Sequence, residues 1–326
     1  MTDQKDIQLL EKLGEMKSRF FNEIGKSVIG QHDVLNHVLI ALLCKGHTLI
    51  VGVPGLAKTL IIKSMSELLD LSFNRIQFTP DLMPSDITGT EVIDETKSSG
   101  KRSFRFFKGP VFGNIILADE INRTPPKTQA ALLEAMQERR VTTAGKSYQL
   151  EEPFFVLATQ NPIEQEGTYP LPEAQLDRFM FNLLIDYPNR DEEISIIKKT
   201  TSLNESVPNK IASKKEILDF QNLVLRVPVA DNVVEYAVDL VTSTRPNKKA
   251  TKFVNDHIEW GAGPRATQSL ILGAKAHAIL NGNPSVNIDD VKKMVYPVLR
   301  HRVIPSYSAD AEGISVDEIL SKLVNG

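Results

Sequence analysis

The chain has 326 residues, of which 41% are hydrophobic and 24% charged, and its formal net charge is −3. This composition is typical of a soluble globular protein, and the length is sufficient for two domains. The net charge gives no overall attraction to nucleic acids or anionic membranes. The single cysteine, Cys44, excludes an intramolecular disulfide and a cysteine-based zinc site. Because no apolar run reaches membrane-spanning length and the N-terminus is polar and acidic, we expect a cytoplasmic protein without membrane insertion.

The first part of the chain alternates helical patterns with short apolar runs. Helical spacing of apolar residues indicates helices within residues 7–28, 33–44 and 122–140. The apolar face predicted for the last of these comprises Ala130, Leu133, Ala135 and Met136. The short apolar runs predict strands at residues 47–51, 114–120, 153–158 and 180–185, and the alternating pattern of residues 73–78 predicts a fifth.

Two segments between these elements are typical of β-hairpins. Residues 90–93 and 103–107 flank the turn-like residues 98–101, which favours a projecting hairpin; the alternative is a long surface loop. Residues 139–150 indicate a second hairpin, turning at 144–146.

The patterning changes at residues 187–191, after which no buried strand is expected. Helical patterns follow at residues 191–203, 213–226, 231–244, 265–281 and 288–299. The sequence therefore predicts an α/β domain over residues 1–188, including the N-terminal helices, and a smaller all-α domain over residues 189–326.

A glycine-rich loop follows the strand at 47–51 and leads into an apolar helical segment. Backbone N–H groups and the positive end of a helix dipole suit a polyphosphate there. Lys58 can reach the β- and γ-phosphates, and the Thr59 hydroxyl can bind Mg²⁺. Ala57 departs from the general pattern, which has glycine at that position; the alternative is a turn that only joins strand to helix. The residues expected to bind the nucleotide are Gly52, Val53, Pro54, Gly55, Leu56, Ala57, Lys58, Thr59 and Leu60.

Polar residues end two further predicted strands. Asp119 would hold Mg²⁺ opposite Thr59, and Glu120 would take a proton from the attacking water. These acids could instead cap the next helix or bind a structural ion. Asn161 stands where an amide could position that water, although Asn-Pro is also common in simple turns.

The order of these motifs resembles that of AAA+ ATPases, and more narrowly of the MoxR family, over nearly the whole chain. The resemblance rests first on the order of residues 52–59, 119–120, 159–162, 176–179 and 263–266. It also rests on segments whose sequence is typical of the family, at residues 28–31, 78–89, 120–127 and 171–175. Alanine at position 57 is itself typical of MoxR-like loops. The resemblance implies a P-loop αβα domain with a five-stranded parallel sheet, followed by a smaller all-α lid domain.

The resemblance also implies roles that spacing alone does not show. Arg178 would be an arginine finger that reaches the γ-phosphate bound by the next subunit of a ring, for which the family expectation is a hexamer; the alternative is an ion pair with Asp177 or Glu173. Arg265 resembles the sensor-2 arginine, which couples phosphate state to lid position. Gly30 and Gln31 match the segment that lines the adenine pocket. ATP and Mg²⁺ are the implied ligands.

The resemblance implies an ATP-hydrolysing, chaperone-like factor that remodels or matures protein complexes. Metal-cofactor insertion and a partner with a von Willebrand factor A domain belong to this expectation. One alternative is a nucleic-acid motor or loader, whose phosphate contacts would be Lys97, Lys101, Arg102 and Arg105 in the first hairpin. The negative net charge disfavours it. A further alternative, a scaffold that binds ATP without turnover, is disfavoured by the presence of Glu120, Asn161 and Arg178.

Overall fold

The computed structural model describes residues 4–95, 102–163, 167–201 and 209–325. Its centre is a five-stranded parallel sheet in the order β2-β5-β8-β1-β9. The strands are β1 (Thr48–Val51), β2 (Phe73–Gln77), β5 (Ile115–Asp119), β8 (Phe155–Gln160) and β9 (Phe181–Leu184). The five predicted strands are thus confirmed, to within a few residues at their ends.

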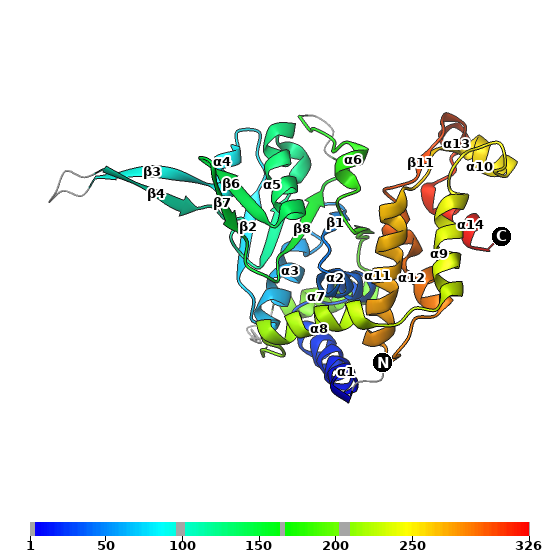
Figure 1. Cartoon of the computed structure of the whole chain (residues 1–326), viewed down its shortest axis with the longest axis horizontal. Coiled ribbons are helices and arrows are strands. Elements are labelled where there is room, and N and C mark those ends of the chain that lie inside the picture. The colour runs from blue at the N-terminus through cyan, green and yellow to red at the C-terminus, as the bar shows by residue number, and fades with distance from the viewer. Residues whose placement is uncertain (1–3, 96–101, 164–166, 202–208, 326) are drawn as a thin grey trace.

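The sheet is buried on both faces at its centre, which explains why the central strands β5 and β8 are nearly continuous apolar runs. In β5, Ile115 and Leu117 face one core, whereas Ile116 and Ala118 face the other. The first core contains α1 (Gln4–Ile24), α2 (His32–Leu43) and α3 (Lys58–Leu68), and the second contains α4 (Pro84–Thr88) and α5 (Pro126–Glu138). This is the predicted αβα sandwich (Figure 1).

The helix expected within residues 122–140 differs from the prediction in two respects. A 3₁₀ turn occupies Ile121–Arg123, and α5 begins only at Pro126. Proline suits the first helical position because its missing N–H would have no partner there, and Pro125 keeps the preceding residue out of the helical region. Leu133, Ala135 and Met136 are buried as predicted, but Ala130 is exposed.

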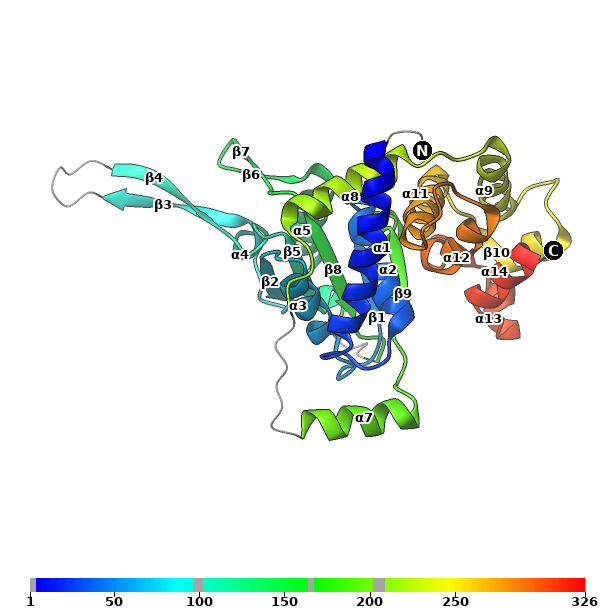
Figure 2. The ribbon, with the colours of Figure 1, turned by 90° about the horizontal axis from the view of Figure 1, so that it is seen from below.

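Both predicted hairpins are present. The first pairs β3 (Gly89–Glu95) with β4 (Arg102–Lys108), and it projects far from the sheet (Figure 2). Its predicted turn at 98–101, with Lys97 and Lys101, lies outside the described residues. The second pairs β6 (Arg140–Thr143) with β7 (Lys146–Gln149).

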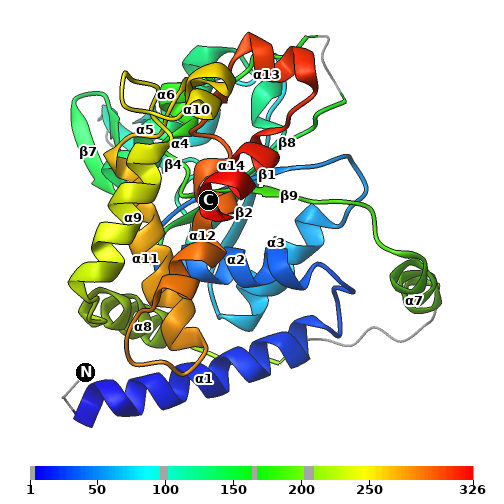
Figure 3. The same ribbon diagram turned by 90° about the vertical axis from the view of Figure 1, so that its right-hand side faces the viewer.

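The rest of the chain is helical and packs beside the α1–α2 layer, whose core is continuous with its own (Figure 3). Its helices are α7 (Arg190–Thr200), α8 (Lys214–Arg226), α9 (Asp231–Ser243), α10 (Lys252–His257), α11 (Pro264–Leu280), α12 (Ile288–Leu299), α13 (Tyr307–Glu312) and α14 (Val316–Asn325). A short sheet of β10 (Ile258–Trp260) and β11 (Ile304–Pro305) was not predicted. Helix α7 has no buried residue and stands apart from the body (Figures 2 and 3). We propose to divide the two domains at residues 188 and 189, between β9 and α7.

Among the described residues, no helix is both long and apolar enough to cross a membrane. The described residues also contain no cluster of three or more histidine, cysteine or acidic side chains that could hold a metal ion.

Candidate active site

The glycine-rich loop joins the end of β1 to the first turn of α3. Gly55 has φ +86°, a left-handed conformation that glycine adopts without steric cost. Ala57 precedes the helix with φ 56° and ψ 20°, so an alanine here adopts a conformation that favours glycine. The side chain of Lys58 folds back over the loop, where Nζ donates hydrogen bonds to the carbonyls of Gly52 (2.5 Å) and Val53 (3.2 Å). The ammonium group is therefore held at the mouth of the loop.

The protonation of Lys58 responds to its surroundings. Partial burial lowers the pKa of its ammonium group, and the carboxylates of Asp119 and Glu120 act in the opposite direction. Because an adjacent anion favours the charged form of lysine, a bound phosphate would act in the same direction as these carboxylates.

Asp119 ends β5 and is held from both sides. The Thr159 hydroxyl, on β8, donates to Asp119 Oδ1 (2.7 Å), and the Arg75 guanidinium, on β2, donates to Oδ2 (2.7 Å). The Thr159 hydroxyl oxygen also accepts the N–H of Glu120 (2.8 Å). Three neighbouring strands thus fix the backbone and side chain of this acidic pair.

Glu120 has a left-handed backbone, with φ 57°, directly after the strand. Its Oε2 accepts hydrogen bonds from Gln77 (3.0 Å) and from Arg123 (2.8 Å). Asn161 follows β8, is 5% exposed, and accepts the N–H of Ile163 at its Oδ1 (3.1 Å). The left-handed backbone of Glu120 is unfavourable for a non-glycine residue, and such conformations often accompany functional sites.

These groups line one hollow of about 460 Å³. Its walls are formed by Pro54, Gly55, Leu56, Ala57, Lys58, Thr59, Leu60, Arg75, Gln77, Asp119, Glu120 and Asn161. The fold therefore brings together the central part of the predicted loop, both acids and Asn161. A hydroxyl and a carboxylate are the hard oxygen ligands that Mg²⁺ prefers, so Thr59 and Asp119 fit this ion in chemistry.

Gly30 and Gln31 lie outside the walls of this hollow, against the segment that follows β9. Gln31 Nε2 donates to the carbonyl of Asp186 (3.1 Å), and a methyl group on Gly30 would come within 2.4 Å of the Glu192 carboxylate. Because β9 pairs with β1, this segment lies beside the start of the phosphate loop.

Arg178 and Arg265 are placed elsewhere. They line a separate hollow of about 210 Å³ with Lys45, Gly46 and His47, which immediately precede β1. The glycine-rich loop follows the other end of the same strand, so the two arginines and the loop lie at opposite edges of the sheet. The expected alternative for Arg178, an ion pair with Asp177 or Glu173, is not formed. Within the described part of the chain, its guanidinium makes no hydrogen bond or ion pair.

Comparisons with known proteins show what the chain is similar to. Residues 47–181 match the sequence profile of the ATPase family associated with various cellular activities (AAA), and residues 251–323 match that of the AAA lid domain. The chain is 40% identical to the chaperone MoxR1 of Mycobacterium tuberculosis, over 93% of this chain and 79% of that protein. It is 29% identical to the protein MoxR of Paracoccus denitrificans, over 88% of each. A crystal structure of a candidate ATPase from Cytophaga hutchinsonii superposes with a TM-score of 0.88, at 42% identity, over 97% of this chain and 96% of that one.

The chain belongs to the MoxR family of AAA+ ATPases. The predicted resemblance is thereby confirmed, as is the fold class, an αβα AAA domain followed by a lid domain. In this MoxR-family chain, the polar groups that surround the acids were not predicted. Arg75 and Gln77 share one face of β2, two residues apart, and that alternation beside Asp119 was the available signal. Thr159 carried no comparable signal, because it meets the acids only through the tertiary placement of its strand. Arg123 is a local partner, three residues after Glu120, and that spacing was its available signal.

Proposed function

We propose that this cytoplasmic protein hydrolyses ATP at the interfaces of a ring of identical subunits, a hexamer, and uses the energy to remodel or mature protein complexes. The observation that carries the proposal is the separation of its arginines from its acids. Arg178 and Arg265 lie at the edge of the sheet remote from the phosphate loop, and Arg178 has no partner among the described residues. A second copy, docked edge to edge, would complete each site.

Within one subunit, the hollow beside the phosphate loop supplies most of the chemistry. The loop N–H groups and Lys58 would bind the phosphates, and Gly30 and Gln31 would border the adenine. Thr59 and Asp119 would hold Mg²⁺, which when bound neutralises charge on the β- and γ-phosphate oxygens. Glu120 would accept a proton from the attacking water, which Asn161 would orient.

The neighbouring subunit would supply positive charge. In nucleoside triphosphatases an arginine finger accelerates hydrolysis by roughly 10³–10⁵-fold, because it stabilises charge that develops in the transition state. Since the Arg178 guanidinium has no ion pair with the described residues, no such pair has to break when it engages a phosphate. Arg265 would act beside it, coupling the phosphate state of the neighbour to the position of its own lid.

A protein client fits the projecting hairpin better than nucleic acid does. Val92, Ile93, Phe104 and Phe107 are large apolar side chains on β3 and β4 that are 44–69% exposed. Arg105 lies over the ring of Phe107, with its guanidinium carbon 5.2 Å from the ring centroid. One relative is named a chaperone. We propose a von Willebrand factor A domain protein as the partner and metal-cofactor insertion as a task of the pair.

The activity is tested by phosphate release from ATP with the purified protein and with Glu120→Gln. We expect the variant to bind ATP and to lose at least about 100-fold in turnover, because the general base is removed while the shape is kept. Equal turnover by both proteins would contradict the assignment of Glu120. The ATP-loaded variant should also retain its protein client during affinity capture. Salt-dependent binding to duplex DNA, without a protein client, would instead favour a nucleic-acid motor.

A further inference from the structure

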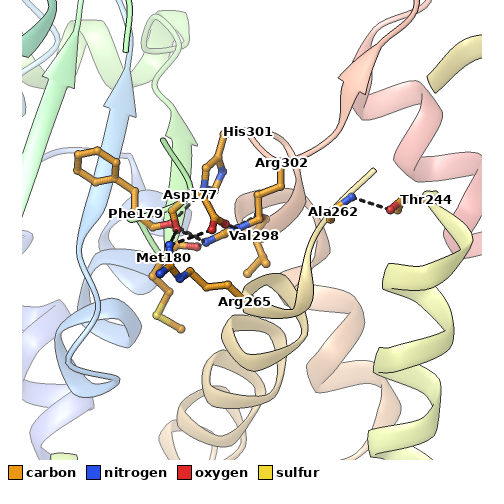
Figure 4. Close-up of polar contacts among 9 residues, drawn as sticks. All are labelled: Asp177, Phe179, Met180, Thr244, Ala262, Arg265, Val298, His301 and Arg302. Atoms are coloured by element: carbon orange, nitrogen blue, oxygen red, sulfur yellow. Dashed lines mark hydrogen bonds and ion pairs between the residues drawn. The ribbon is translucent and has the colours of Figure 1, made fainter. Parts of the chain in front are cut away.

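The segment that carries Arg178 is held by a buried arginine of the lid. Arg302 follows α12, and its side chain is only 2% exposed. Its Nε donates to Asp177 Oδ1 (2.7 Å), and its Nη2 donates to the carbonyls of Phe179 (2.8 Å) and Asp177 (3.3 Å). Its Nη1 donates to the carbonyls of Met180 (3.2 Å) and Val298. Figure 4 shows this cluster of contacts.

Burial of the charged Arg302 guanidinium costs free energy, and its hydrogen bonds fix the direction of each partner. A buried guanidinium is tolerated only when its charge is paired and its donors are satisfied, as they are here. The preceding residue adds a further bond, because Nε2 of the buried His301 contacts the carbonyl oxygen of Phe179 (3.0 Å). Two consecutive lid residues thus hold the backbone on both sides of Arg178.

Asp177 connects the same cluster to Arg265. Arg265 Nη1 donates to Asp177 Oδ2 (2.9 Å), while Arg302 uses the other carboxylate oxygen. Arg265 lies in the first turn of α11, where a cation opposes the helix dipole and the carboxylate of Asp177 offsets that effect. The loop before α11 is itself fixed, since the N–H of Ala262 donates to the Thr244 hydroxyl (2.9 Å; Figure 4).

This arrangement explains the state of Arg178. Both oxygens of the adjacent carboxylate are engaged by lid arginines, so Asp177 does not pair with Arg178. The guanidinium of Arg178 stays available, while the backbone that carries it is bound to the lid.

We propose that Asp177 and Arg302 are positioning residues that present Arg178 and Arg265 as one rigid pair to the neighbouring subunit. The inference rests on the proposed function, in which both arginines act on the nucleotide of the next copy. Because Asp177 and Arg302 link them, the lid and the segment that carries Arg178 move as a unit. A displacement of the lid therefore moves both arginines toward or away from the neighbouring site.

The test compares Asp177→Asn and Arg302→Met with Arg300→Met. Arg300 is a matched control, because it is also a lid arginine that pairs with a carboxylate, Asp317 (2.7 Å), and reaches a sheet carbonyl, that of Asn182 (3.1 Å). Within the described part of the chain, Arg300 makes no hydrogen bond or ion pair with residues 177–180. We expect kcat to fall by about 10- to 100-fold in the two test variants, because a catalytic group displaced by about 1 Å can cost that much. KM and nucleotide affinity should stay within about twofold of the original values.

Thermal unfolding distinguishes a variant that misplaces Arg178 from a variant that fails to fold. Asp177 is 34% exposed, so Asp177→Asn should fold even if Arg302→Met does not. If Arg300→Met lowers kcat as much as Asp177→Asn does at equal stability, or if Asp177→Asn raises KM and leaves kcat unchanged, the positioning role is wrong.

Mixed assemblies with Glu120→Gln then distinguish this inference from the proposed function. Glu120→Gln subunits carry intact arginines, and Asp177→Asn subunits carry intact acids, so mixing should restore part of the turnover. Restoration by Arg178→Ala subunits but not by Asp177→Asn subunits would overturn the positioning role alone. Failure of both mixtures in stable mixed assemblies would overturn the shared site, and the inference with it.

Discussion

At the scale of the residue, Ala57 shows how this site departs from the general phosphate loop. Its backbone is left-handed, with φ 56°, at the residue before α3. The left-handed conformation costs an L-residue with a Cβ atom roughly 1–2 kcal/mol of free energy, whereas glycine has no such cost. The alanine that is typical of the family at this position therefore has an unfavourable backbone conformation. The surrounding loop must offset its cost in free energy.

Replacement of Ala57 by glycine should stabilise the protein. We expect the free energy of unfolding to rise by about 0.5–1 kcal/mol, because relief of the left-handed strain exceeds the extra entropy that glycine gives the unfolded chain. Urea denaturation measures the change. Ala131→Gly, in the interior of α5, is the control and should destabilise by about 1 kcal/mol. A loss of stability in Ala57→Gly would contradict the left-handed conformation.

At the scale of the element, the two hairpins are joined by aromatic packing. Phe106 on β4 stacks on Tyr148 on β7, with ring centroids 4.1 Å apart, and also contacts Phe112 edge to face. An ion pair between Lys146 and Glu91 (3.2 Å) reinforces the contact. The base of the projecting hairpin is thereby fixed to the second hairpin, which follows α5 directly.

Removal of the aromatic contact should loosen the projecting hairpin without unfolding the sheet. For Tyr148→Ala we expect amide hydrogen exchange in β3 and β4 to accelerate by up to about 10-fold, since an aromatic pair contributes about 0.5–1.5 kcal/mol beyond its buried area. Phe104→Ala is the control on the same strand, because Phe104 is 69% exposed and supports no such contact. Unchanged exchange in Tyr148→Ala would show that the stack does not anchor the hairpin.

At the scale of the whole molecule, each subunit of the proposed ring would carry two half-sites, at opposite edges of its sheet. The hollow with Lys58 and Glu120 lies at the end of β1, and the hollow with Arg178 and Arg265 lies before its start. Parallel strands make this polarity possible, because all their carboxyl ends meet at one edge. A ring of such subunits would place unlike edges together at every interface, as a heterologous contact requires.

Loss of one half-site should be rescued by a subunit that lacks the other. Arg178→Ala and Glu120→Gln proteins should each be nearly inactive, whereas a mixture should recover a measurable fraction of the original turnover. Phosphate release from pre-mixed subunits measures the recovery, and light scattering verifies that mixed assemblies form. A stable mixed assembly with no more activity than either variant would exclude a shared site.

The sequence was most informative where chemistry and chain order coincide. The strand, loop and helix around Gly52–Thr59, the acids at the end of β5 and five helices of the lid follow from local pattern, and the structure places each within a few residues of the prediction. The lid helices α10, α13 and α14 were not predicted. The start of α5 was missed because two adjacent prolines override the helical spacing of the residues before them. The partners of the acids, Arg75 and Thr159, were missed because they come from neighbouring strands and meet Asp119 only across the sheet.

By itself, the sequence identified the chain as a MoxR-like AAA+ ATPase and predicted a phosphate loop at Gly52–Thr59, because the residues of this loop are contiguous in the chain. Only the tertiary structure decided where Arg178 and Arg265 lie relative to that loop. Their placement depends on how the lid packs against the sheet, through contacts between Asp177 and Arg302 that are 125 residues apart. No local pattern encodes such a contact, since it forms only when both domains have folded against each other.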